Sequence, residues 1–380
     1  MKILFTGGGT AGHVNPALAT AKYIRELDDT VEIRFAGAKG GIEEKLVKRE
    51  GFHLYTYDVK GIQRSLSPKG IATNLMRVKN LFGSIKAAKK DLTLWRPDVI
   101  IGTGGYASFP MVYAGAKMGI KTSMLEVNAY PGVAVKYLSQ MVDSVMISFR
   151  ETEKLIPKAK KTVFTGSPIR GDIINASGTN VKMEMFGNEK PLLLSFWGSV
   201  GAQYMNEKMC DFIKIAQEEN LFNVIHATGA EAYKWMPPML KEKGVDVDDL
   251  KNIRLMEYIY DMGEKMAAAD IIMCRGGASS LAEVCAAGKP SVIAPSPYVT
   301  DNHQEKNARV IEKNGAAVVV LEKQISGKDM YETVKSIILD KEKMAEMGKN
   351  AKKMAVTDGT EKIFKEILRL LMNPSEHKPL

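Results

Sequence analysis

The sequence predicts an α/β protein built from two doubly wound domains that face each other across a cleft. Three observations lead to this prediction. The chain has 380 residues, which is enough for two domains of ordinary size. Short β-rich runs alternate with helical stretches from end to end, as in parallel sheets with crossover helices. The alternation stops at a polar stretch, residues 175–190, and then starts again.

The expected strands are short, and several are apolar throughout, as in strands that are covered on both faces. In the first half they span residues 2–6, 31–36, 53–57, 99–102, 121–125, 144–147 and 162–165. In the second half they span residues 191–196, 223–227, 252–255, 271–274, 291–294 and 316–320. Each half therefore carries enough strands for a sheet of its own.

Composition excludes several classes of protein. With 45% hydrophobic and 26% charged residues, the chain suits a globular protein with a large core. Its three cysteines form no C-x-x-C pair, which argues against a disulfide framework or a structural zinc site and favours buried thiols in a reducing compartment. No apolar run is long enough to span a bilayer, and the first five residues lead straight into glycines, so we expect neither a signal peptide nor export from the cytoplasm.

A glycine-rich loop, residues 7–13 (GGGTAGH), follows the first strand, and Asn15-Pro16 is expected to open a helix. The loop matches G-x-G-x-x-G, but the second strand ends at Gly37 without the acid that would hold a dinucleotide ribose. The sequence therefore favours another anionic ligand, bound by backbone N–H groups at a helix N-terminus, over a nicotinamide or flavin dinucleotide.

His13 ends this loop and is a candidate general base. Imidazole has an ordinary pKa near 6.5, so the neutral ring accepts protons at neutral pH. The alternative is a histidine that only hydrogen-bonds the loop. The residues alone leave both interpretations open.

Three loops of the second half also follow strands and lead into helices: residues 196–202, 274–283 and 295–305. Small residues at these positions let a ligand approach the backbone, and the helix after Gly277 offers a seat for a diphosphate. Glu283, inside that helix, is a candidate for binding sugar hydroxyls or else an ordinary solvated glutamate. Asp246-Val247-Asp248 has a metal-binding spacing, but it lies in a charged segment and is interpreted as a solvated loop, which favours metal-free chemistry.

The segment 60–96 holds nine basic residues and one acid, so it carries most of the net charge of +9. Within it, apolar residues recur at helical spacing: Ile71, Leu75, Val78, Phe82 and Ile85. The stripe is interpreted either as a face packed on the domain or, with the lysines beside it, as a surface for anionic lipid headgroups. Nucleic acid is a less favoured partner, because no nucleic-acid-binding motif is recognisable.

Taken together, these motifs resemble the MurG family of transferases, from Met1 to about Leu371. The most specific stretches are residues 7–16, 102–106 (GTGGY), 166–170 (GSPIR), 274–288 and 302–308 (NHQEKNA). The family moves N-acetylglucosamine from UDP-N-acetylglucosamine to undecaprenyl-diphosphoryl-N-acetylmuramoyl-pentapeptide (lipid I), which makes lipid II, a peptidoglycan precursor. The resemblance implies a GT-B architecture of two Rossmann-like domains and an inverting transfer that needs no metal and no cofactor.

The resemblance also implies domains and site residues. It places an acceptor domain at residues 1–165, a UDP-sugar domain at 166–357, and a helix at 358–372 that packs back on the first domain. His13 corresponds to the general base and Glu283 to the acid that holds the ribose hydroxyls. The remaining positions are expected to bind substrate: Thr10, Ala11 and Gly12 near both substrates, and Asn128, Arg170, Ser199, Ile259 and Gln304 at the donor. The basic segment would hold the enzyme on the cytoplasmic face of the membrane.

The chain departs from the family pattern at two loops. It has Trp197-Gly198-Ser199-Val200 where the family commonly has Gly-Gly-Ser followed by Gln or Arg, and Leu125-Glu126-Val127-Asn128 in place of His-Glu-Gln-Asn. These departures bear on donor selectivity and acceptor fit more than on the fold. Three alternatives remain: a GT-B transferase with another lipid acceptor, a UDP-N-acetylglucosamine 2-epimerase, and a protein that binds nucleotide-sugar without turnover.

Overall fold

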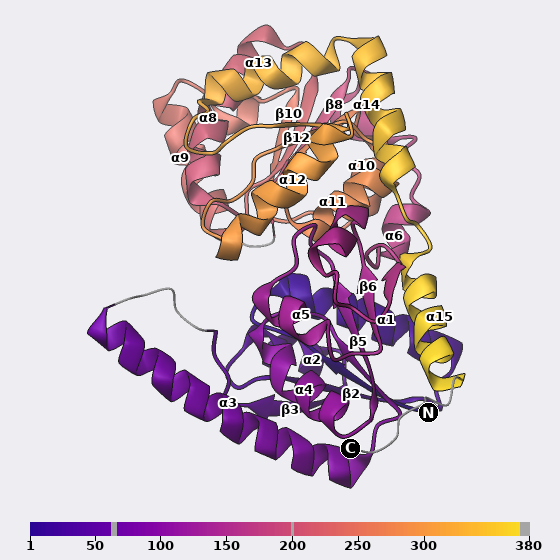
Figure 1. Cartoon of the computed structure of the whole chain (residues 1–380). Helices are drawn as coiled ribbons and strands as arrows, with labels where there is room; N and C mark the ends of the chain where they lie inside the picture. The colour runs from indigo at the N-terminus through magenta and orange to yellow at the C-terminus, as the bar shows by residue number, and fades with distance from the viewer. Residues whose placement is uncertain (62–66, 199–200, 373–380) are drawn as a thin grey trace. The chain divides into compact units, whose positions relative to one another are not determined.

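The computed structural model describes residues 1–61, 67–198 and 201–372 (Figure 1). Within these residues the chain folds into two units, each built around a parallel sheet. The N-terminal unit contains Met1–Pro168 and the segment that begins at Asp358, and the C-terminal unit contains Ile169–Thr357. The two predicted doubly wound sheets are therefore confirmed.

Strands and helices alternate along both units. The N-terminal unit contains β1 (Lys2–Thr6), α1 (Ala11–Leu27), β2 (Glu32–Ala38), α2 (Ile42–Arg49), β3 (His53–Tyr57), α3 (Pro68–Trp95), β4 (Val99–Gly102), α4 (Phe109–Lys117), β5 (Lys121–Glu126), α5 (Val133–Leu138), β6 (Ser144–Ile147), β7 (Thr162–Phe164) and α15 (Gly359–Met372). The C-terminal unit contains α6 (Gly171–Ile174), α7 (Val181–Phe186), β8 (Leu192–Phe196), α8 (Gln203–Glu219), β9 (Asn223–Ala227), α9 (Ala230–Glu242), β10 (Ile253–Met256), α10 (Met262–Ala268), β11 (Ile271–Cys274), α11 (Ala278–Ala286), β12 (Ser291–Ile293), α12 (His303–Lys313), β13 (Ala317–Val319), α13 (Gly327–Ile338) and α14 (Lys341–Met354). Each predicted strand is present, with its bounds shifted by two residues at most.

The order of the strands in each sheet determines which loops lie at a potential binding site. Over the described residues the orders are β3-β2-β1-β4-β5-β6-β7 and β10-β9-β8-β11-β12-β13, and the pairs are parallel. The direction of winding reverses between β1 and β4 in one sheet and between β8 and β11 in the other. Ligands of open parallel sheets bind at the carboxyl ends of the strands beside such a reversal. The loops after β1, β4, β8 and β11 are therefore the places to look for a site.

The first helix begins earlier than predicted. The expectation that Asn15-Pro16 opens it is wrong, because the N–H groups of His13 and Val14 already bond to the Thr10 carbonyl and α1 starts at Ala11. Pro16 lies in the second turn, where its missing N–H removes one helical hydrogen bond. His13 therefore belongs to the first turn of α1, close to the positive end of the helix.

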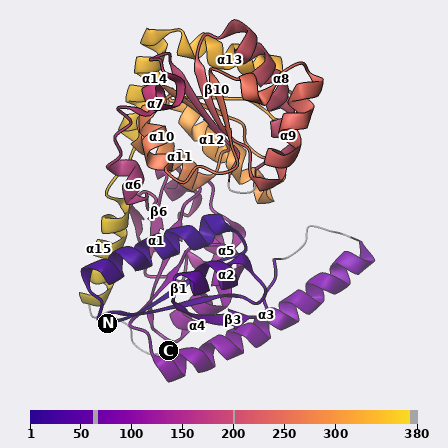
Figure 2. The ribbon, with the colours of Figure 1, turned by 180° about the vertical axis from the view of Figure 1, so that it is seen from behind.

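Helix α3 packs on the sheet only along its second half. Ala88, Leu92 and Trp95 are buried in the core beside α4, and Ile85 packs against the same core. The apolar stripe from Ile71 to Phe82 lies outside this core, and Figures 1 and 2 show the first half of α3 extending past the sheet. The interpretation of the whole stripe as a packed face is thus wrong. None of the described helices is long and apolar enough to cross a bilayer.

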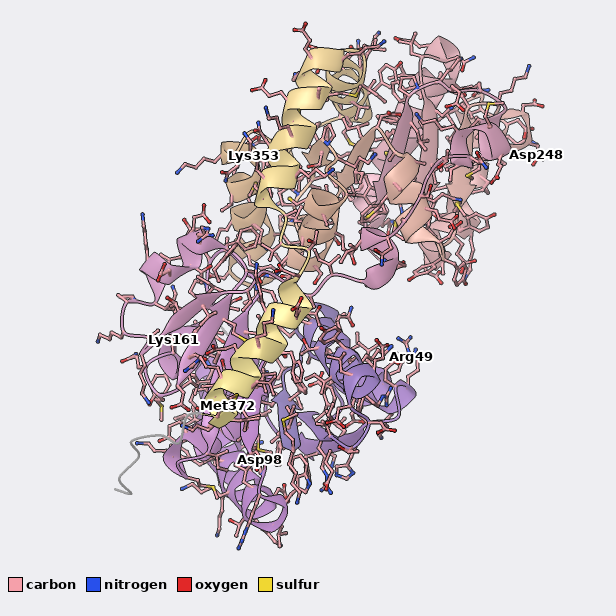
Figure 3. The ribbon with its side chains drawn as sticks, turned by 90° about the vertical axis from the view of Figure 1, so that its right-hand side faces the viewer. Arg49, Asp98, Lys161, Asp248, Lys353 and Met372 are labelled. Carbon is pink, nitrogen blue, oxygen red and sulfur yellow. The ribbon has the colours of Figure 1, made fainter. Side chains whose placement is uncertain are left out.

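The C-terminal helix α15 belongs to the N-terminal unit. Its buried residues Ile363, Ile367 and Leu370 pack inward, and it contacts α1 and β4. Glu366 is 4% exposed in its side chain and pairs with Arg369 at 2.7 Å and Lys161 at 3.7 Å. Figure 3 shows Lys161 beside this helix and Met372 at its end. The chain therefore leaves the N-terminal unit after Pro168 and returns to it at Asp358.

Ile367→Ala should lower the free energy of unfolding of the N-terminal unit by about 2–5 kcal/mol, because it removes a fully buried side chain and leaves a cavity. Lys365→Ala, on the exposed side of the same helix, should change it by less than about 0.5 kcal/mol. Urea unfolding followed by circular dichroism measures both variants. Equal effects of the two substitutions would contradict the described packing of α15.

Candidate functional site

The imidazole of His13 lies against the loop after β4. That loop contains Gly104 and Gly105, both with positive φ (97° and 73°). A Cβ atom on Gly104 would come within 2.9 Å of His13 Cδ2, and one on Gly105 within 3.0 Å of His13 Nδ1. Thr103 Oγ1 donates to the His13 carbonyl at 2.7 Å. Glycine at these two positions thus lets the ring of His13 lie flush with the backbone.

Hydrogen bonding fixes which ring nitrogen of His13 carries the proton. Nδ1 lies 3.1 Å from the Gly8 carbonyl and 3.2 Å from Thr10 Oγ1. A carbonyl oxygen only accepts, so Nδ1 is the donor to Gly8 and, in the neutral ring, Nε2 carries a lone pair. The two interpretations of His13 are therefore compatible, since Nδ1 bonds the loop while Nε2 has a lone pair that can accept a proton.

Thr10, Ala11 and Gly12 form the start of α1. Thr10 is the N-cap residue with extended backbone, and its side chain does not cap the helix. Ala11 and Gly12 are the first two residues of the helix, where N–H groups point out of its N-terminus. The three predicted substrate contacts and His13 thus lie together at the switch point of the first sheet.

Asn128 lies in the N-terminal unit, whereas Arg170, Ile259 and Gln304 lie in the C-terminal unit. Its backbone and side-chain N–H groups both donate to Glu126 Oε1, at 2.9 and 3.0 Å. The other carboxylate oxygen of Glu126 accepts from Gly132 N at 3.1 Å, so this one acid closes the loop after β5. Burial raises the pKa of Glu126 to about 7, although these three donors favour the charged form. Val127 is buried beside it.

In the C-terminal unit the structure brings Arg170 and Glu283 together. Arg170 Nε donates to Glu283 Oε1 at 3.0 Å and lies 3.7 Å from Asp172. Glu283 projects from α11, and its side chain is 16% exposed. Burial raises the pKa of this carboxyl, and the neighbouring guanidinium opposes the rise. Glu283 is thus not a solvated helix residue. It is paired with Arg170, which was also predicted as a site residue.

Gln304 packs against the start of α11. Its Oε1 accepts from Ser296 N at 2.8 Å, which leaves the amide NH₂ as the donor end of the side chain. A Cβ atom on Gly276 would meet the Gln304 carbonyl at 2.2 Å, and Asn307 Nδ2 donates to Gly276 O at 3.2 Å. The N-cap residue of α11 is Gly277, which has no side chain to cap the N–H groups of the first turn. These groups suit an anion.

A hollow of about 530 Å³ adjoins Gln304 within the same unit. Its lining includes Trp197, Ala202, Tyr204, Arg275, Ser296 and Gln304. Arg275 pairs with the buried Glu322, donates to the Ala294 carbonyl at 2.9 Å and lies 5.7 Å over the Trp197 ring. Trp197 is 3% exposed, so most of its bulk packs in the core. Ser199 and Val200 lie outside the described residues.

Two other features singled out in the sequence are Ile259 and the Asp246–Asp248 segment. Ile259 is buried in the loop between β10 and α10, between Tyr258 and Tyr260, whose exposed rings contact each other with centroids 4.9 Å apart. Asp246 accepts from Asp248 N at 3.1 Å and caps a short 3-10 turn, which fits a solvated loop. Within the described residues the three cysteines are free and buried.

Three residues with structural roles at these loops were not among the predicted site residues: Glu43, Glu126 and Arg275. Glu43 is 1% exposed and accepts from Gly9 N at 3.1 Å and Ala38 N at 2.7 Å. A signal exists in each case. Glu43 is four residues before the buried Val47 on α2, so it shares the inward face of that helix. Glu126 is the last residue of the buried strand β5, and Arg275 directly follows the buried strand β11.

Comparisons with known proteins show the family to which the chain belongs. The chain matches the glycosyltransferase family 28 N-terminal domain over residues 3–147 and the C-terminal domain of that family over residues 192–363. It is 41% identical over 374 residues to the UDP-N-acetylglucosamine--N-acetylmuramyl-(pentapeptide) pyrophosphoryl-undecaprenol N-acetylglucosamine transferase of Acetivibrio thermocellus, covering 98% of this chain and 99% of the relative. The protein of the same name from Ruminiclostridium cellulolyticum is 40% identical, with 98% and 100% covered. The crystal structure of MurG from Acinetobacter baumannii superposes with a TM-score of 0.78 at 24% identity, over 97% of this chain and 99% of that one.

Glu126→Gln should change how stability depends on pH. Between about pH 4.5 and 7 the carboxyl of Glu126 keeps its proton in the native state but has lost it in the unfolded state, because its pKa is raised on folding. The contribution of Glu126 to the free energy of unfolding is therefore present below this pH range and is lost as the pH rises through it. From pH 5 to 8 the free energy of unfolding of the wild type should fall by roughly 2–3 kcal/mol relative to the variant.

Urea unfolding at several pH values measures this difference. Glu151→Gln, at an exposed position of the same unit, is the control and should keep the wild-type pH dependence. A Glu126→Gln profile parallel to that of the wild type would show that Glu126 stays ionised throughout.

Proposed function

Because the chain belongs to the MurG family within glycosyltransferase family 28, we propose that it transfers N-acetylglucosamine from UDP-N-acetylglucosamine to the 4-hydroxyl of undecaprenyl-diphosphoryl-N-acetylmuramoyl-pentapeptide, with inversion and without a metal. The relatives share this name over nearly their whole length. They favour this activity over a 2-epimerase and over a transferase with another lipid acceptor.

The observation that carries the mechanism is the hydrogen bond from His13 Nδ1 to the Gly8 carbonyl. It leaves Nε2 as the lone-pair nitrogen of a partly exposed ring in the first turn of α1, which begins with Ala11 and Gly12. A general base needs a lone pair that can accept a proton, a fixed orientation and access to the substrate.

The C-terminal unit supplies groups for the donor. The first-turn N–H groups of α11 are placed to bind the diphosphate, and Glu283 to accept from the ribose hydroxyls. The Arg170 guanidinium, with Nε 3.0 Å from Glu283 Oε1, balances the charge of this carboxylate. The amide NH₂ of Gln304 is a donor for the sugar hydroxyls, next to the hollow that Trp197 and Arg275 line.

The reaction is then a single displacement. Nε2 of His13 takes the proton of the acceptor 4-hydroxyl as that oxygen forms a bond to the anomeric carbon. The bond from the anomeric carbon to the diphosphate oxygen breaks, and UDP leaves with the electron pair. The helix dipole and the N–H groups of α11 stabilise the charge on the leaving diphosphate. One displacement inverts the anomeric centre.

His13→Ala should reduce kcat by about 10²- to 10⁴-fold, the range that general-base catalysis contributes, with the Kd for UDP-N-acetylglucosamine changed by less than about threefold. Transfer of labelled N-acetylglucosamine to a lipid I analogue measures the rate, and calorimetry measures donor binding. His53→Ala, on β3 of the same unit, is the matched control and should retain activity. Turnover of His13→Ala within a few-fold of the wild type would show that another group is the base.

We propose further that α3 holds the protein on an anionic membrane surface. Its stripe is half or more exposed at Ile71 (50%), Leu75 (68%) and Phe82 (68%), an unusual patch for a surface helix. Lys79 and Lys86 follow Leu75 and Phe82 by one helical turn, so cations flank the apolar side chains. Apolar insertion and attraction to lipid headgroups add on such a surface.

Leu75→Ser/Phe82→Ser should weaken binding to phosphatidylglycerol vesicles at least about tenfold, because two apolar side chains no longer insert. Sedimentation with vesicles measures the bound fraction. Leu27→Ser, at an exposed leucine at the end of α1, should leave it unchanged. Equal binding of the double variant and the wild type would exclude α3 as the membrane-binding surface.

A further inference from the structure

The peptide group between Gly8 and Gly9 is held from both sides. Its carbonyl oxygen, on Gly8, accepts from His13 Nδ1 at 3.1 Å. Its N–H group, on Gly9, donates to Glu43 Oε2 at 3.1 Å. One planar peptide unit thus connects a buried carboxylate on α2 with the imidazole on α1.

The position of the Glu43 carboxylate is tightly enclosed. Glu43 is 1% exposed, and its other oxygen accepts from Ala38 N at 2.7 Å. A Cβ atom on Gly8, Gly37 or Gly41 would come within 2.0, 2.5 and 2.5 Å of this side chain. The absence of a side chain at these three glycines thus makes room for the Glu43 carboxylate. A larger residue at any of the three positions would displace this carboxylate.

We infer that Glu43 is a positioning residue for His13 and acts through the Gly8–Gly9 peptide. The inference rests on the proposed role of His13 as the base. Glu43 fixes the plane of this peptide, so the Gly8 carbonyl faces His13 Nδ1 and the ring keeps its proton there. It also polarises the peptide, because a negative charge on the N–H side strengthens the carbonyl oxygen as an acceptor.

The same contact assists the reaction. When Nε2 takes the acceptor's proton, the ring becomes positively charged while Nδ1–H still donates to Gly8 O. The polarised carbonyl and the Glu43 charge stabilise that cation, and the proton on Nδ1 stays where it is. In other catalytic histidines a directly bonded carboxylate orients the ring and stabilises its charged form. Here Glu43 has this effect on His13 through the peptide group that lies between them.

Other titratable groups around this loop are Tyr106 and Arg77. The Tyr106 ring lies against Gly9, where a Cβ atom would come within 2.9 Å of it, and Arg77 donates to the Gly61 carbonyl. Burial raises the pKa of Tyr106, the charge of Glu43 adds to the rise and that of Arg77 opposes it. Tyr106 is therefore neutral at physiological pH, which leaves Glu43 as the negative charge next to the peptide.

The test compares Glu43→Gln with Glu44→Gln. Both variants remove one negative charge from the first turn of α2, but Glu44 bonds Gly40 N at 2.8 Å and not the His13 loop. Glutamine at position 43 has one acceptor oxygen for the two N–H groups of Gly9 and Ala38, so one of these two hydrogen bonds is lost. We expect kcat to fall about tenfold in Glu43→Gln with the KM for UDP-N-acetylglucosamine within twofold, and Glu44→Gln to match the wild type.

A second readout does not depend on turnover. In protein with ¹⁵N- and ¹³C-labelled histidine, ring shifts should show the Nδ1–H form of His13 in the wild type. In Glu43→Gln the population of that form should drop and the titration midpoint of His13 should move to lower pH, since the cation has lost a nearby negative charge. The acid limb of the pH–rate profile should move the same way.

An Nε2–H form of His13 in the wild type, or a tautomer and titration midpoint unchanged in Glu43→Gln, would overturn the inference. The wild-type measurement decides even if Glu43→Gln fails to fold, and Glu43→Asp, which keeps the charge but shortens the reach, is the second variant. If His13→Ala retains activity while the ring shifts respond to Glu43, the proposed base is wrong but the peptide link is intact. The two failures are therefore distinguishable.

Discussion

Parallel strand pairing is the constraint on which the rest of the structure depends. Because the strands of each sheet run in one direction, their carboxyl ends meet at one edge, and the loops there converge at the point where the winding reverses. His13 follows β1 and rests on the loop after β4. Gln304 and the first turn of α11 meet in the same way after β12 and β11. Residues far apart in sequence thus form each site through sheet order alone.

Buried polar side chains then give these loops one conformation. Glu43 accepts two backbone N–H groups at the end of β1 and β2, and Glu126 accepts three N–H groups after β5. Gln304 does the same for the loop after β12. Each of these side chains satisfies backbone donors that the loops leave without a strand partner, which a buried loop requires. The proposed substrate-binding groups are therefore held in one arrangement by residues that need not touch a substrate.

The fold, and most of the residues that make up the candidate site, could be predicted because they leave local signals. Strand positions follow from apolar runs and from the glycine turns after them, and His13, Glu283 and Gln304 lie in motifs next to those turns. Other features depend on the tertiary structure. The early start of α1 could not be read from Pro16, since the turn before it is held by backbone bonds to Thr10, and the exposed half of α3 shows the same periodicity as its packed half. Glu43 reaches Gly9 across 34 residues, and only the structure gives that distance.

In the proposed reaction one displacement, with His13 as base and without a metal, moves the sugar to the lipid-linked acceptor. The most direct measurement is the anomeric configuration of the product that the wild-type enzyme forms from UDP-N-acetylglucosamine and a lipid I analogue in the presence of EDTA, read from the NMR coupling of the new anomeric proton. Because the donor sugar is α-linked to UDP, the account predicts a β-linked disaccharide. An α-linked product, or transfer abolished by EDTA and restored by a divalent cation, would contradict it.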